Sequence, residues 1–201
     1  MAREDSFTNT GLNREDEHFR KWDLELIKRM RTSAEREAER RHIAEAIGVT
    51  DDTVLDQLQE LGLTCQTVKL LYLLPPLYVA WIDGSVTKRE GECLLELARS
   101  LGIEEGTSSY KRLSDWLQHR PSHEFFRKAR GTIKSILEAM PFEEEQNNRH
   151  LIISRCTQVA GASGGVLGLG SKVSYAEWEV MKEIARELAS TNQVSAERGV
   201  Q

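Results

Sequence analysis

The segment Val86-Thr-Lys-Arg-Glu-Gly-Glu-Cys-Leu-Leu-Glu-Leu-Ala-Arg-Ser-Leu101 has a second copy 87 residues further along the chain, Val173-Ser-Tyr-Ala-Glu-Trp-Glu-Val-Met-Lys-Glu-Ile-Ala-Arg-Glu-Leu188. Seven of the sixteen aligned positions are identical, and Thr87 is matched by the chemically similar Ser174. A repeated unit usually cannot bury its apolar face alone. We therefore expect the two copies to pack as a pseudo-symmetric pair of helix-loop-helix units.

Each copy begins with the sequence signature of a helix start. Thr87-Lys-Arg-Glu90 and Ser174-Tyr-Ala-Glu177 both have the form of a capping box. In this motif the hydroxyl accepts a hydrogen bond from the amide three residues later, and the Glu carboxylate accepts one from the amide of the cap residue. The sequence therefore predicts that Thr87, Glu90, Ser174 and Glu177 are helix-capping residues.

The remaining sequence predicts an all-helical fold, because apolar residues recur three and four positions apart and no strand-like alternation persists. Pro75 and Pro76 predict a kink or break inside one helix, since proline donates no backbone hydrogen bond. The predicted helices cover residues 14–47, 50–61, 65–82, 88–101, 109–119, 122–140, 142–160 and 175–190.

Composition divides the chain into four parts. Residues 1–13 and 191–201 lack apolar periodicity and are expected to be disordered. Residues 14–63 form a predicted N-terminal helical extension, and residues 64–190 form the repeat-containing domain. In the extension an apolar stripe passes through Trp22, Leu26 and Met30, so one hypothesis is a helical arm for self-association.

Charge and hydropathy argue against several classes of protein. The net charge of −5 lacks the excess of Lys and Arg that binding to nucleic acid requires. The longest apolar run, residues 70–82, contains two prolines and is shorter than the ~20 residues of a membrane-spanning helix. The N-terminus has no apolar segment typical of a secretory signal, so we expect a cytoplasmic protein.

Two stretches carry a family resemblance. Leu74-Pro-Pro-Leu-Tyr-Val-Ala-Trp-Ile-Asp-Gly-Ser-Val-Thr-Lys-Arg-Glu90 and Gly164-Gly-Val-Leu-Gly-Leu-Gly-Ser-Lys-Val-Ser-Tyr-Ala-Glu177 resemble the TerB-like family. That family has a helix ending in Ala-x-x-Asp-Gly, a short loop, and a Ser/Thr-x-x-Glu helix start, found twice. In the second unit Ser163 stands at the position that matches Asp83, which departs from this pattern.

The resemblance covers about residues 64–190 and implies an all-helical fold like that of bacterial tellurite-resistance proteins. It further implies a non-enzymatic, stress-linked module that acts through protein partners. Some members are associated with the inner membrane face or with divalent cations. A peripheral membrane-linked complex is therefore one expected setting for this chain.

Asp83 and Glu90 flank one short loop and are candidate oxygen ligands for Ca²⁺ or Mg²⁺. Two observations favour a purely capping role for Glu90. A helix N-terminus disfavours a cation, and Ca²⁺ uses six to eight oxygens where the sequence offers two carboxylates. A rival hypothesis is a metal-dependent enzyme with Asp83, Glu90 and Glu177 around one ion, which requires convergence within about 5 Å.

Other catalytic or cofactor-binding patterns fail. The glycine-rich stretch 161–171 superficially resembles a phosphate-binding loop, but Ser171 separates Gly170 from Lys172 and no strand precedes it. Cys93 and Cys156 occupy apolar helical positions without a neighbouring base that would activate a thiol. The leading interpretation is therefore a non-enzymatic interaction or scaffold protein without a bound organic cofactor.

Overall fold

The computed structural model describes residues 6–162 and 174–188, with side chains from residue 18 onward. Every regular element in these ranges is a helix, which confirms the all-helical class for the described part of the chain. None of the described helices is both long enough and apolar enough to cross a membrane. The chain divides into two compact units, Met1–His42 and Ile43–Gln201.

The first unit consists of most of helix α1, Ser6–Ile47. The helix begins eight residues before the predicted start, so it includes residues that the sequence placed in a disordered lead-in. All side chains from His18 to Glu37 are exposed. Only the last turn of α1, from Ile43, belongs to the second unit, where Ile43 is fully buried.

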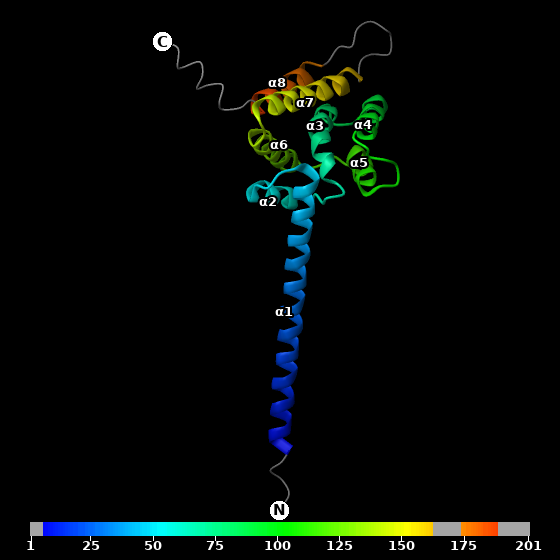
Figure 1. The fold of residues 1–201 in the computed structure, drawn as a ribbon. Coiled ribbons are helices and arrows are strands. Elements are labelled where there is room, and N and C mark those ends of the chain that lie inside the picture. The colour runs from blue at the N-terminus through cyan, green and yellow to red at the C-terminus, as the bar shows by residue number, and fades with distance from the viewer. Residues whose placement is uncertain (1–5, 163–173, 189–201) are drawn as a thin grey trace, which may run out of the picture. The chain divides into compact units, whose positions relative to one another are not determined.

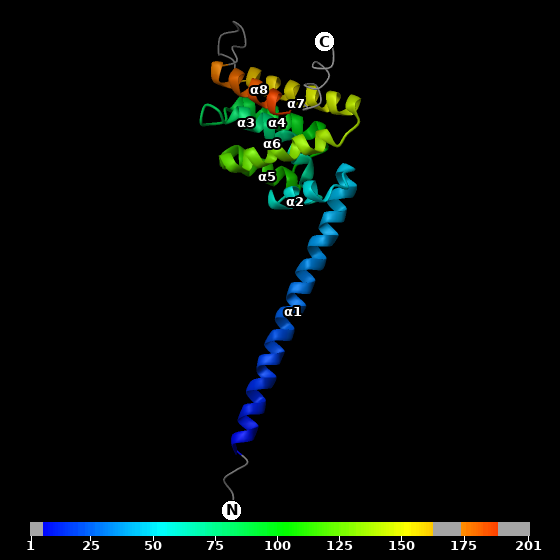
Figure 2. The same cartoon turned by 90° about the vertical axis from the view of Figure 1, so that its left-hand side faces the viewer.

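The second unit is a bundle of helices around a buried centre (Figure 1). Its elements are α2 (Asp52–Glu60), the 3₁₀ helix η1 (Val68–Leu73), α3 (Leu74–Ala80), α4 (Lys88–Ser100), α5 (Ser108–Gln118), α6 (His123–Glu138), α7 (Phe142–Ala162) and α8 (Tyr175–Glu187). Helix α3 is the centre, since all of its residues are buried and it contacts η1, α4, α6, α7 and α8. Figure 2 shows α7 and α8 side by side across α3.

The two prolines determine where α3 begins. The segment that the sequence predicted as one helix is a 3₁₀ helix, Val68–Leu73, followed by α3, and Pro75 and Pro76 occupy the first turn of α3. Amide groups in the first turn of a helix need no intrahelical acceptor, so proline costs little there. The predicted break is therefore present and takes the form of a new helix start.

The compact unit begins earlier than the predicted domain. Helix α2 buries Val54, Leu55 and Leu58 and packs against α6. Arg112 of α5 donates hydrogen bonds to the carbonyls of Leu61, at 3.1 Å, and of Gly62, where α2 ends. Residues 43–63 thus belong to the same compact unit as the helices that follow.

Helices α4 and α8 match each other in length and position. They start at Lys88 and Tyr175 and end at Ser100 and Glu187, so each boundary is separated by 87 residues, the offset of the sequence repeat. Both helices pack against α7. The starts of these two helices are the places where the sequence predicted functional residues.

Candidate functional site: two buried capping glutamates

The start of α4 is a complete capping box. The Thr87 hydroxyl accepts a hydrogen bond from the Glu90 amide at 3.3 Å, and Glu90 Oε2 accepts one from the Thr87 amide at 2.7 Å. Glu90 is 3% exposed although it is charged at neutral pH in water. The carboxylate can be buried here because the helix start supplies an amide donor and a partial positive charge.

The start of α8 repeats this geometry. The Ser174 hydroxyl accepts from the Glu177 amide at 3.2 Å, and Glu177 Oε2 accepts from the Ser174 amide at 2.6 Å. Glu177 is 2% exposed. Two carboxylates from distant parts of the sequence are therefore both buried, and each accepts a hydrogen bond in the same capping-box motif.

These carboxylates share one electrostatic environment. Burial raises the pKa of Glu90, the hydrogen bonds from Thr87 lower it in part, and the negative charges of Glu177 and Asp83 raise it further. The sequence repeat places the two glutamates at equivalent positions, and the fold adds that the charge of Glu177 acts on Glu90.

Asp83 is the exposed carboxylate of the three. It sits in the loop between α3 and α4, next to Gly84, whose φ of 86° favours glycine. The ligand oxygens of Asp83, Glu90 and Glu177 do not all lie within 4.8 Å of one another in the described structure. This spacing does not favour the three-carboxylate enzyme site, which needs tighter convergence.

The carboxylates of Asp83, Glu90 and Glu177 are of a type that can bind a cation through a few oxygens and water. In Glu90 and Glu177 one carboxylate oxygen accepts the cap amide, and hard cations such as Ca²⁺ and Mg²⁺ prefer carboxylate and water oxygens. Mutual repulsion between nearby carboxylates would be relieved by a divalent cation. The glycine-rich stretch and Ser163, which the sequence analysis singled out, lie outside the described residues.

The buried cysteines do not have the environment of a catalytic nucleophile. Burial raises the pKa of Cys156 to about 12, so its thiol is protonated at neutral pH. Burial also raises the pKa of Cys93, and the nearby charges of Glu96 and Glu90 act in the same direction. Neither environment favours the thiolate, which is the reactive form.

Sequence reasoning missed a buried charged residue that ties two helices together. Arg130 of α6 is 5% exposed and pairs with Glu187 of α8, with 2.5 Å between Nε and Oε2. Its guanidinium group also lies 4.8 Å from the ring centroid of Tyr78 in α3. The signal was present in the sequence, because Arg130 follows the buried Phe126 by four positions and precedes the buried Ile133 by three.

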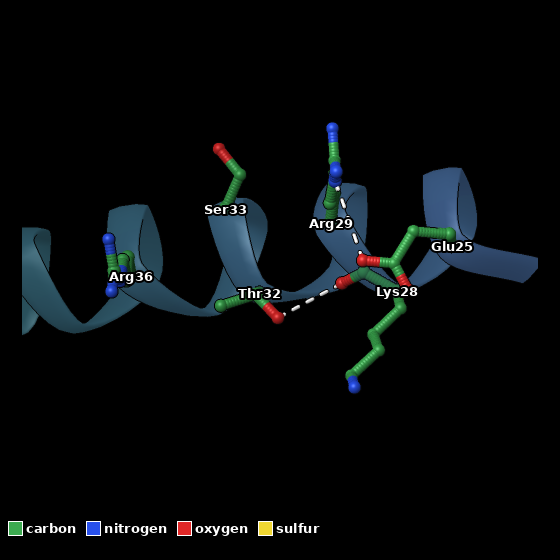
Figure 3. A pocket seen from close by; sticks show the side chains of 6 residues that line it. All are labelled: Glu25, Lys28, Arg29, Thr32, Ser33 and Arg36. Carbon is green, nitrogen blue, oxygen red and sulfur yellow. Dashed lines mark hydrogen bonds and ion pairs between the residues drawn. The ribbon is translucent and has the colours of Figure 1, made fainter.

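Helix α1 carries a separate surface feature. Figure 3 shows a shallow groove lined by side chains of α1 alone: Glu25, Lys28, Arg29, Thr32, Ser33 and Arg36. Arg29 pairs with Glu25 at 3.5 Å, and the Thr32 hydroxyl donates to the Lys28 carbonyl at 3.0 Å. These are ordinary contacts one turn apart on a solvated helix, so the groove is not an enclosed site.

No family model, no curated protein and no solved structure matches this chain.

Proposed function

We propose that the protein is a non-enzymatic TerB-like helical module that acts as a stress-response interaction or scaffold protein. The proposal is supported by two helices of equal length, α4 and α8, that start 87 residues apart with the same capping box. It is also supported by the environments of Cys93 and Cys156, which disfavour thiolates. The setting expected from the resemblance is the cytoplasm, with protein partners in a peripheral membrane-linked complex.

We further propose that this module binds a divalent cation weakly at Asp83 and Glu90. The observation that carries this proposal is the burial of Glu90 within the fields of two other carboxylates, Glu177 and Asp83. A cation would be held by Asp83, by the second oxygen of Glu90 and by water. Because both glutamates already accept hydrogen bonds from cap amides, the affinity is expected to be low.

Calorimetric titration of Ca²⁺, Mg²⁺ and Mn²⁺ into the metal-stripped full chain tests this site. Saturable binding that is lost in Asp83→Asn and kept in Glu105→Gln supports it. Glu105 is a suitable control, because it is an exposed carboxylate in the loop that follows α4. Absence of binding, or equal loss in both variants, would leave Glu90 and Glu177 as capping residues alone.

A second candidate function is a self-associating helical adaptor that works through the N-terminal extension. It is favoured by the exposure of large apolar side chains on α1, where Trp22 is 68% and Met30 64% exposed. Soluble monomers rarely expose a contiguous series of such residues without a partner. This candidate is compatible with the first, since it concerns a different unit of the chain.

A further inference from the structure

The side chains of the apolar stripe on α1 become smaller from the N-terminal to the C-terminal part of the helix. Its N-terminal part holds large exposed side chains, and its C-terminal part holds Ser33 and Ala34, which are also exposed. At 3.6 residues per turn these side chains share one face, because each of them lies three or four positions from another member. The large members are Phe19 at 66%, Trp22 at 68%, Leu26 at 57%, Ile27 at 47% and Met30 at 64% exposure.

We infer that this face binds a second copy of the chain in antiparallel orientation, with Leu26 of one copy opposite Met30 of the other. This inference rests on the adaptor function proposed above and names its partner. In the same register Trp22 lies opposite Ala34 of the second copy, so a large side chain meets a small one. A parallel pair would instead place Trp22 against Trp22 and Ala34 against Ala34, which leaves both a clash and a gap.

Charge disfavours the parallel orientation. A parallel pair would place Arg31 of one copy beside Arg36 of the other, and like charges at flanking positions disfavour that orientation.

The pair Glu25 and Arg29 fits this arrangement as well. Within one helix these two residues are 3.5 Å apart. In the antiparallel register Glu25 of one copy lies two positions, about 3 Å along the axis, from the level of Arg29 of the second copy, so the four charges alternate in sign. An alternating cluster offsets part of the repulsion between the other basic residues of this segment, such as Lys28.

The size of the stripe sets the expected strength of association. Phe19 and Trp22 each expose about two thirds of their surface, and an aromatic side chain can bury ~150–250 Å². With Leu26, Ile27 and Met30 the apolar contribution approaches, without clearly exceeding, the ~800 Å² per partner of a standard interface. A reversible dimer in the micromolar range is expected, and not a permanent one.

Sedimentation velocity on the full chain across the micromolar range tests the association. Wild type is expected to show a concentration-dependent dimer, and Leu26→Glu is expected to raise the dissociation constant at least ~10-fold. Leu24→Glu is the matched control, because Leu24 is 67% exposed but lies about 160° around the helix from Trp22. Equal weakening by both substitutions, or a wild-type monomer at all concentrations, would overturn the inference.

Two further variants test the orientation. A mixture of Trp22→Cys and Ala34→Cys chains should form a disulfide between the variants above the wild-type background. Cross-linking of Trp22→Cys chains to each other at the same rate would contradict the antiparallel orientation.

A lipid surface is the other occupant to distinguish, because Arg20, Lys28 and Arg31 lie on or beside this segment. A monomeric chain that co-sediments with vesicles of phosphatidylcholine and phosphatidylglycerol would overturn the inference and assign the stripe to anionic lipid. Unfolding is monitored in parallel by circular dichroism. Cation titration of Leu26→Glu separates this inference from the cation proposal, since Asp83 belongs to the other unit.

Discussion

Arg130 is the residue whose environment gives the sharpest test of the fold. Its side chain is 6% exposed, whereas its partners Glu187 and Glu183 are 40% and 52% exposed. Nε lies 2.5 Å from Glu187 Oε2, and Nη2 lies 3.8 Å from Glu183 Oε1. Nη1 is buried and has no hydrogen-bond partner in the described structure. The free-energy cost of removing the Arg130 guanidinium from water is therefore only partly offset by its ion pairs.

We expect Glu187→Gln to destabilise the protein more than Arg130→Met. Removing one partner of a fully buried ion pair costs about 3–5 kcal/mol, because it leaves the other charge buried. The partial exposure of Glu187 and the nearby Glu183 reduce this to about 2 kcal/mol for Glu187→Gln. In Arg130→Met the two released carboxylates regain water, and the main loss is the stacking on Tyr78, about 1 kcal/mol.

Urea unfolding monitored by circular dichroism measures both variants, and a loss of about 2 kcal/mol would also lower Tm by roughly 4–8 °C. Glu183→Gln is the control, because an exposed carboxylate 3.8 Å from its partner contributes less than about 1 kcal/mol. If Arg130→Met proves the more destabilising variant, attraction outweighs desolvation at this site and the reasoning is refuted.

Two further predictions concern the repeated helix starts. Thr87→Ala and Ser174→Ala should each cost about 1 kcal/mol, because both hydroxyls accept one cap hydrogen bond, at 3.3 and 3.2 Å; Ser135→Ala inside α6 should be neutral in the same urea assay. A clearly unequal loss at the two caps would contradict their equivalence. Because the pKa of Glu90 is raised, the folded state holds its proton more tightly than the unfolded state. The Glu90 contribution to stability should therefore be full below the ordinary carboxyl pKa of ~4.3 and fall as pH rises through the higher folded value. The difference in urea midpoint between wild type and Glu90→Gln should therefore decrease as the pH rises. A difference that increases with pH would contradict the burial of Glu90 beside Glu177.

The sequence predicted the positions of the helices because the core of this fold is mostly apolar and the helices are amphipathic. Buried Leu94, Leu97 and Ala98 in α4 follow the helical spacing, so periodicity was sufficient there. The same applies to the break at Pro75, since a proline inside a predicted helix indicates a boundary. The 3₁₀ geometry of η1 carries no comparable local signal, because its residues other than Lys69 are apolar and would also suit an α-helix.

The boundary of the compact unit could not be read from the sequence in the same way. The sequence before Thr64 shows an ordinary amphipathic helix, and nothing local distinguishes an arm from a core element. The difference is tertiary, since Leu58 is fully buried in α2 while Leu26 in α1 is 57% exposed. Apolar periodicity indicates that a helix has one hydrophobic face, but it does not indicate which surface covers that face.

Local sequence also could not place the two capping glutamates relative to each other. The capping box explains why Glu90 and Glu177 are buried, and it requires no ligand. It does not explain why two such helix starts lie within each other's electric field, which raises the pKa of Glu90 further. If capping alone accounts for both residues, Glu90→Gln removes a repulsion while its side-chain oxygen can still accept from Thr87, and the variant should be at least as stable as wild type at neutral pH. If a cation offsets the repulsion, that advantage disappears when the ion is present, so the comparison with and without added divalent cation separates the two roles of one residue.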